Sequence, residues 1–145
     1  AALGAKVGRP DKTVWSIAGD GGFQMTMCDL ATAAENKIDV KFAILNNGSL
    51  GLVRQLQDLF FDQERFATQY TANPDFVKLA EAYGIHGIRV TAKDRVNGAI
   101  QEAMETPGPV VIDFRVVEGE NVYPMIPAGA SVNEMIEEPA SEGIH

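Results

Sequence analysis

The sequence predicts an α/β domain built on a parallel β-sheet that is flanked by helices on both faces. Short apolar, β-prone runs alternate with helical patterns along the chain, and these runs are apolar throughout rather than at every second residue. Parallel strands need a crossover between them, which the intervening helices supply. With 145 residues, the chain is long enough to bury the core of one such domain.

The individual elements follow from local patterns. Strands are expected at residues 13–18, 40–45, 87–90 and 109–116, the first two of them buried. The opening residues resemble the end of a helix that Gly8 and Pro10 stop. Further helices are expected at residues 24–36, 51–61, 74–83 and 94–105.

Residues 1–120 are predicted to form the domain, and residues 121–145 an extended C-terminal tail. Three prolines, at positions 124, 127 and 139, favour an extended tail. The chain begins inside a helical pattern without an N-cap residue or an initiator Met. We therefore expect the N-terminal edge of the domain to be truncated and the chain to be a piece of a longer protein.

Composition excludes several classes of function. The formal net charge of −8 would repel a nucleic-acid backbone over most of the surface. Cys28 is the single cysteine, so the chain has no internal disulfide and no thiolate metal cluster. No apolar run approaches the roughly 20 residues of a membrane span, and no signal peptide is evident. We expect a cytoplasmic protein that binds neither nucleic acid nor membranes.

Polar residues follow the ends of the first two predicted strands. Asp20 lies in a glycine turn after the first, and Asn46 and Asn47 follow the second. The carboxyl ends of parallel strands meet at one edge of a sheet, which is where ligands bind. Glycines let a large anion approach the backbone, and carboxylate, amide and carbonyl oxygens suit Mg²⁺, with a carbonyl near Ser49 as a third ligand. The spacing therefore predicts a site for Mg²⁺ and a phosphate group.

Each of these motifs taken alone is also typical of an ordinary turn. GDG and NNG sequences are frequent in turns that bind nothing. Their positions after two neighbouring strands favour a functional interpretation. A dinucleotide site is the main rival, but G-x-G-x-x-G is absent after the first strand, and so is a Walker-type phosphate loop.

The text around these motifs resembles a known family. "GDGGFQM" followed by "ILNN" resembles the thiamine diphosphate motif of the enzymes that depend on this cofactor. "VKFAILNNGSLGLVRQLQDLFF", "TPGPVVIDFRV" and "VYPMIPAGASVNEMI" resemble the C-terminal part of the acetolactate synthase (acetohydroxyacid synthase) catalytic subunit. The resemblance covers nearly the whole chain and is most specific over residues 122–136.

This resemblance implies roles for individual residues. Asp20 and Asn47 would bind Mg²⁺ through their side chains, and Ser49 through its carbonyl. The residues that would contact the cofactor are Gly19, Asp20, Gly21, Gly22, Asn46, Asn47, Gly48 and Leu52. Leu52 and Leu56 would face the substrate channel, although helical periodicity alone favours core packing for both.

This chain departs from the family pattern at one position. Many family members carry a tryptophan where this chain has Leu56. In the family, that tryptophan contributes to the preference for 2-oxobutyrate as second substrate and to the binding of herbicides. The resemblance therefore does not imply these two properties for this chain.

The family resemblance also implies an activity. These enzymes decarboxylate pyruvate and condense the remaining two-carbon unit with a second 2-oxo acid, giving 2-acetolactate or 2-aceto-2-hydroxybutyrate in branched-chain amino acid biosynthesis. The implied cofactors are thiamine diphosphate and Mg²⁺, with FAD in the full-length protein. The implied partners are small 2-oxo acids, further copies in a homodimer or homotetramer, and a small regulatory subunit. The family's activating glutamate lies in an N-terminal domain. No catalytic residue is therefore expected here, and the fragment alone should be inactive.

Two alternatives stay open. The chain could belong to another thiamine diphosphate-dependent decarboxylase or carboligase, such as a pyruvate oxidase or a sulfoacetaldehyde acetyltransferase, which product analysis would separate. It could also be a non-catalytic phosphate-binding module, which would bind the cofactor without turnover.

Overall fold

A computed structural model describes residues 1–138, so the part of the predicted tail beyond them, with Pro139, lies outside the described residues. Strands and helices alternate along the chain, as the sequence predicts. The strands are β1 (Val14–Gly19), β2 (Val40–Asn46), β3 (His86–Val90) and β4 (Val110–Arg115). The α-helices are α1 (Ala2–Gly8), α2 (Asp20–Gln24), α3 (Asp29–Glu35), α4 (Gly51–Phe60), α5 (Phe76–Ala82) and α6 (Val96–Glu105).

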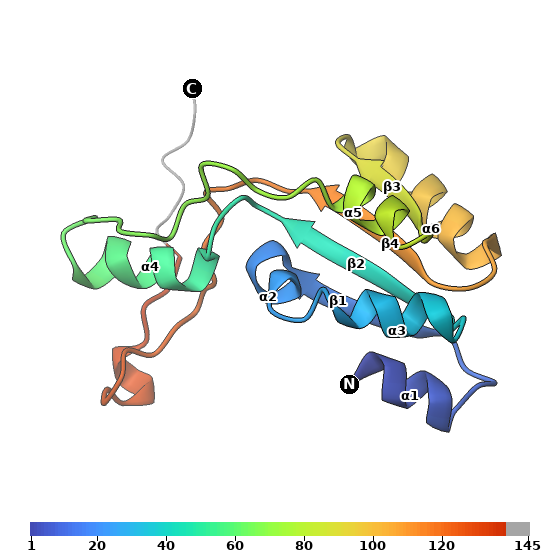
Figure 1. Cartoon of the computed structure of the whole chain (residues 1–145). Helices are drawn as coiled ribbons and strands as arrows, with labels where there is room; N and C mark the ends of the chain where they lie inside the picture. The colour runs from blue at the N-terminus through green and yellow to red at the C-terminus, as the bar shows by residue number, and fades with distance from the viewer. Residues whose placement is uncertain (139–145) are drawn as a thin grey trace.

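The four strands form one parallel sheet in the order β1-β2-β4-β3, which confirms the predicted α/β class (Figure 1). Gly19 at the end of β1 pairs in register with Leu45 of β2. Asn46 at the end of β2 pairs with Arg115 of β4. The carboxyl ends of these three strands therefore meet at one edge of the sheet.

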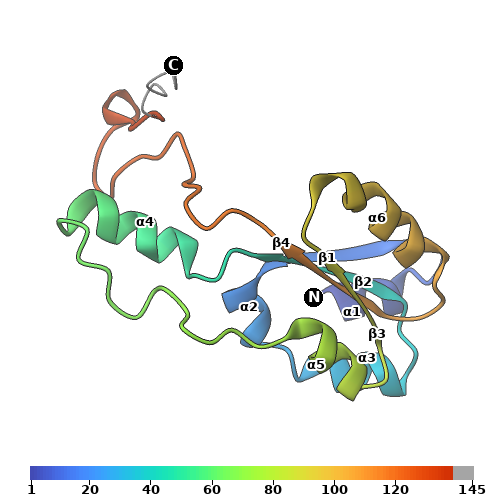
Figure 2. The ribbon, with the colours of Figure 1, turned by 90° about the horizontal axis from the view of Figure 1, so that it is seen from above.

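Helices cover both faces of the sheet. On one face, α2, α3 and α5 contribute to the larger core together with side chains of β2; its fully buried members include Leu30, Ile44 and Phe76. On the other face α6 packs against β3 and β4 around Ala103, Val110 and Ile112. Figure 2 shows α6 on the opposite side of the sheet from α3 and α5. In the described part of the chain, no helix has the length and apolar character of a membrane span.

The prediction that the first strand is buried is wrong. β1 is an edge strand, and its Ile17 side chain is 71% exposed. On the same side of the sheet Leu45 of β2 is 44% exposed. The reason is that α6 covers β3 and β4 and does not extend over this part of the sheet.

Two further segments differ from the prediction. The helix expected at residues 24–36 is divided, because consecutive i to i+3 hydrogen bonds from Thr26 to Phe23 and from Asp29 to Thr26 form turns between α2 and α3. The tail is not simply extended. Met125 and Ile136 form an isolated antiparallel bridge, and a capping box joins Ser131 to Glu134 between them.

The start of α5 is capped by Asp75. The carboxylate of Asp75 accepts hydrogen bonds from the backbone N–H groups of Val77 and Lys78. Gly84, with φ of +71°, ends the helical segment. The loop that holds Asn73 is thereby fixed just before the helix, a position that matters at the candidate site.

Candidate functional site

A cavity of about 700 Å³ lies at the carboxyl edge of the sheet. The loops after β1, β2 and β4 contribute to its lining, together with α4. Most of the residues that the sequence singled out line this cavity: Gly19, Asp20, Gly21, Gly22, Asn47, Ser49 and Leu52. Asn46, Gly48 and Leu56 are not part of the lining.

Asp20 begins α2 and is 1% exposed. Its Oδ1 accepts a hydrogen bond of 3.0 Å from the backbone N–H of Gly21. Its Oδ2 accepts one of 2.9 Å from the N–H of Gly48 and one of 2.6 Å from Nδ2 of Asn73. These donors are all neutral, so they hold the carboxylate in place while its charge stays available to a cation.

The loop after β2 is held by local and distant hydrogen bonds. Gly48 has a φ of +71°, a conformation that favours glycine. Asn47 Oδ1 accepts a bond of 3.1 Å from the N–H of Ser49, and the N–H of Leu50 donates to Thr68 O at 2.8 Å. Ser49 Oγ is buried and has no hydrogen-bond partner among the described residues. The described residues therefore leave this hydroxyl without a partner, and Ser49 is one of the residues that line the cavity.

The glycines after β1 differ in what surrounds them. A Cβ added at Gly19 or Gly22 would meet no atom within 4 Å, so both face open space. A Cβ at Gly21 would lie 2.6 Å from Leu50 Cδ2 and from Tyr70 OH. Gly21 therefore allows close packing within the protein, whereas Gly19 and Gly22 leave room for a ligand.

Tyr70 lies beside the glycine turn and the acidic group. Burial, and secondarily the charge of Asp20, raise the pKa of its phenol above the usual value of 10.0. The phenol is therefore protonated at neutral pH, and it adds no negative charge to the site.

Helix α4 and the segment after β4 form the outer side of the cavity. Leu52 and Leu56 are 64% and 42% exposed, so the core packing that periodicity favoured is wrong for both in this structure. The buried side of the helix carries Arg54 and Gln55 instead.

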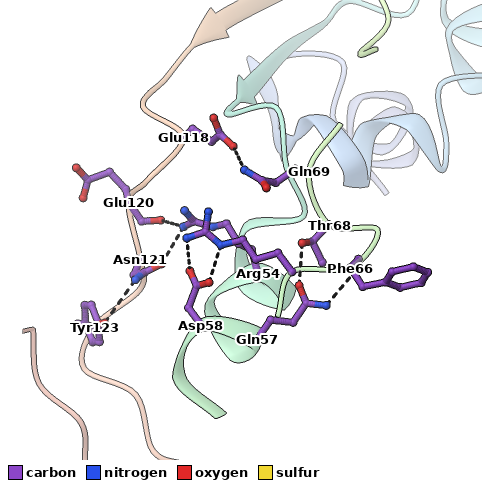
Figure 3. A network of polar contacts seen from close by, with 11 residues as sticks. Arg54, Gln57, Asp58, Phe66, Thr68, Gln69, Glu118, Glu120, Asn121 and Tyr123 are labelled. Carbon is purple, nitrogen blue, oxygen red and sulfur yellow. Dashed lines mark hydrogen bonds and ion pairs between the residues drawn. The ribbon is translucent and has the colours of Figure 1, made fainter. Parts of the chain in front are cut away.

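Hydrogen bonds attach this helix to the segment after β4. Gln55 accepts a bond from the N–H of Val122 and donates one to its carbonyl, both at 2.8 Å. Arg54 Nη2 donates to the carbonyl of Glu120 at 3.0 Å and to Oδ1 of Asn121 at 2.8 Å (Figure 3). The helix and the chain segment therefore form one wall.

A second group of polar residues lies behind Asp20, and the sequence interpretation missed most of it. Asn46, 2% exposed, donates through Nδ2 to Oδ1 of Asp113 at 2.9 Å. Asp113 is completely buried and also accepts from Arg89 Nε at 3.2 Å. A single carboxylate inside the apolar run VVIDF was a signal for Asp113. Asn73 showed no local signal beyond the helix start that follows it.

Comparison with known proteins now adds to this geometry. Residues 1–114 match the family model described as "Thiamine pyrophosphate enzyme, C-terminal TPP binding domain". The chain is 44% identical over 137 residues to the acetolactate synthase isozyme 2 large subunit of Escherichia coli, covering 94% of this chain and 25% of that protein. It is 49% identical over 140 residues to the acetolactate synthase large subunit of Corynebacterium glutamicum, covering 93% and 22%.

A solved structure agrees with the fold. The thiamine diphosphate-dependent 4-hydroxybenzoylformate decarboxylase of Rhodococcus jostii RHA1 superimposes with a TM-score of 0.74 at 32% sequence identity. The match covers 80% of this chain and 22% of the decarboxylase. The chain thus spans about a quarter of the length of the relatives that it matches.

Proposed function

The chain belongs to the thiamine pyrophosphate enzymes as a C-terminal TPP-binding domain, and we propose that it is the part of an acetolactate synthase large subunit that binds the diphosphate of the cofactor. One observation carries the proposal. Asp20, Asn47 and Ser49 line the same cavity as two glycines with open space beside them. Oxygen ligands and an open backbone surface are what a magnesium diphosphate requires.

The proposed metal ligands are Asp20 and Asn47 through their side chains and Ser49 through its carbonyl. Asp20 offers the one anionic oxygen, and its hydrogen-bond partners are all neutral. Asn47 Oδ1 accepts one hydrogen bond and keeps a second lone pair. Neutral ligands from Asn47 and Ser49 would limit the negative charge that faces the phosphate groups. This donor set fits Mg²⁺.

The proposed diphosphate site lies against Gly19, Gly21 and Gly22. Open space beside Gly19 and Gly22 and the unpartnered hydroxyl of Ser49 support this placement. Asn46 and Gly48 are proposed to contribute from behind the cavity by supporting Asp20 and the loop. Leu52 lines the cavity, and with Leu56 one turn later it is proposed to face the substrate channel.

When bound, thiamine diphosphate supplies an electron sink for the decarboxylation of a 2-oxo acid. The role of this chain would be to bind and orient. Asp20 and the loop at residues 47–49 would hold the metal and diphosphate, and the apolar side of α4 would limit water near the substrates. Pyruvate would be the first substrate and a second 2-oxo acid the acceptor. The group that activates the cofactor is proposed to lie outside this chain.

The proposal extends to the complete protein. FAD, a homodimer or homotetramer, and a cytoplasmic location belong to it. A small regulatory subunit also belongs to it, because the relatives are named large subunits. Residues 1–120 would form the cofactor-binding domain, and residues 121–145 its tail.

A second candidate is another decarboxylase or carboligase that uses the same cofactor. The structural similarity to a 4-hydroxybenzoylformate decarboxylase supports it, because the shared fold carries different substrates. This candidate places the same residues on the metal and differs in the substrates and products.

The full-length protein should be assayed with pyruvate, with and without 2-oxobutyrate, in the presence of Mg²⁺ and thiamine diphosphate. We expect 2-acetolactate as the main product and none from the isolated 145-residue chain. An aldehyde or acetyl phosphate as the main product would favour the second candidate. Mg²⁺-dependent cofactor binding without any turnover would favour a non-catalytic binding module.

A further inference from the structure

We infer that Asn73 is a positioning residue for Asp20. We infer further that the buried Asp113 sets the orientation of the Asn73 side-chain amide. The inference rests on the proposed role of Asp20 at the metal site. Asn73 lies 53 residues after Asp20, in the loop before α5, and is not among the residues that line the cavity. Its effect on the cofactor would therefore pass through the Asp20 carboxylate.

Asn73 uses both ends of its amide. Nδ2 donates to Asp20 Oδ2 at 2.6 Å and to Asn46 Oδ1 at 3.0 Å. Oδ1 accepts from Nε2 of Gln24 at 3.1 Å. If the amide were reversed, its oxygen would face two other oxygens, so the neighbours allow one orientation.

That orientation can be traced to Asp113. Its Oδ1 accepts from Asn46 Nδ2, and Arg89 Nε donates to its Oδ2. A carboxylate only accepts, so Asn46 must direct Nδ2 toward β4 and Oδ1 toward Asn73. Asn73 must then present Nδ2, which also reaches Asp20. A fixed order of donors and acceptors thus runs from β4, at the centre of the sheet, to the metal site.

The loop before α5 is connected to Asp113 by a second route, through Arg89. Arg89, which holds Asp113, also donates through Nη2 to Oδ1 of Asp75, the N-cap residue of α5. Asn73 and Asp75, two residues apart, are therefore attached to the same buried Asp113, one through Asn46 and the other through Arg89. This double attachment restrains the loop and the direction of the Asn73 amide.

The consequence for Asp20 is a carboxylate held at both oxygens. Backbone N–H groups of Gly21 and Gly48 hold one oxygen each, and Asn73 adds the single side-chain donor among the described hydrogen bonds. Without that donor, the carboxylate would gain rotational freedom and lose a charge-assisted bond. Groups that orient a metal ligand typically change metal affinity by 10- to 100-fold when they are removed.

The test is Asn73→Ala in the full-length protein. Mg²⁺ is titrated calorimetrically at saturating thiamine diphosphate, and the unfolding midpoint is measured without metal and cofactor. We expect Mg²⁺ binding to weaken about tenfold or more. Asn36→Ala is the matched control, because it removes an exposed amide that donates to Thr32 O at 3.0 Å, and it should bind Mg²⁺ like wild type.

Asp113→Asn is the second variant and tests the origin of the orientation. It keeps the volume but offers one acceptor where two donors now point, so Mg²⁺ binding should weaken severalfold. Wild-type Mg²⁺ affinity in both variants would overturn the inference, as would an Asn73→Ala variant that loses stability without losing affinity. If Asn73→Ala does not fold, Asp113→Asn alone decides by the same criterion. Absence of Mg²⁺-dependent cofactor binding in the wild type would instead refute the proposed function.

Discussion

The cavity has two walls that are built in opposite ways. The inner wall carries the buried carboxylate of Asp20, with Asn46 and Asp113 behind it on the strands. The outer wall consists of α4 and the segment after β4, and it presents exposed apolar side chains such as Leu52 to the cavity, with the exposed Leu56 one turn further along α4. The first wall is polar and buried, and the second is apolar and exposed.

The walls also differ in how their polar groups are satisfied. At the inner wall, side chains bind one another, so moving one residue disturbs the next. At the outer wall, Arg54 and Gln55 bind mainly to the backbone of residues 120–122, and the outward side chains are not involved. If the proposed function is correct, we expect the inner wall to determine whether a cofactor binds and the outer wall to vary with the substrate.

Asp20→Ala should have the largest effect on the inner wall. A methyl group leaves the metal without its anionic ligand, so the affinity for thiamine diphosphate in the presence of Mg²⁺ should fall about a hundredfold or more. Calorimetry on the full-length protein measures this affinity. Asp29→Ala removes an exposed carboxylate of α3 and serves as the control. An Asp20→Ala variant that retains the cofactor like wild type would refute the metal assignment.

Gly22→Val tests whether the open space at the inner wall belongs to a ligand. Added side-chain atoms should obstruct the diphosphate and weaken cofactor binding about tenfold, while the free energy of unfolding without cofactor changes by about 1 kcal/mol or less. Gly98→Val on α6 is matched, because a Cβ there also meets no atom within 4 Å. Equal cofactor affinities in the two variants would mean that the space at Gly22 is not used.

Leu56→Trp addresses the outer wall. An indole adds a large apolar surface, and a changed pocket contact shifts substrate discrimination by roughly 1–3 kcal/mol. We expect wild type to favour coupling of two pyruvates. The variant should raise the ratio of 2-aceto-2-hydroxybutyrate to 2-acetolactate when pyruvate and 2-oxobutyrate compete. Ile100→Trp, at a similarly exposed site on α6, should leave this ratio unchanged. An unchanged ratio in Leu56→Trp would remove Leu56 from the substrate channel.

Asp75→Ala should produce the smallest effect and tests the support behind the inner wall. The N–H of Lys78, and next the Arg89 side chain, lower the pKa of Asp75 below its ordinary value of 3.8. A lowered folded-state pKa contributes stability above the ordinary value, and this is lost as the pH falls through the folded-state pKa. The variant should therefore unfold about 1 kcal/mol more easily at pH 7.

Urea unfolding at several pH values measures this difference. The gap between wild type and Asp75→Ala should narrow below about pH 4, because wild type then loses the same contribution. Asp29→Ala, which removes an acid in the first turn of α3 that does not cap the helix, should lack this pattern. A gap that stays constant down to low pH would contradict the capping role of the charged form.

The sequence by itself determined the parallel α/β fold and the position of the candidate site. The strands and helices are signalled by local patterns, and the polar residues after two parallel strands must meet at one edge of the sheet. Asp20, Asn47 and Ser49 could therefore be identified from the text alone, and they do line one cavity.

The tertiary structure alone decided which residues stand behind and opposite that site. Asn73 reaches Asp20 because the loop before α5 crosses the end of the sheet. Asp113 reaches Asn46 because β4, and not β3, is the strand that pairs with β2 on that side. The exposure of Leu56 depends on what covers α4, which helical periodicity does not reveal. These properties arise from contacts between residues far apart in the chain, and local patterns of polarity do not predict such contacts.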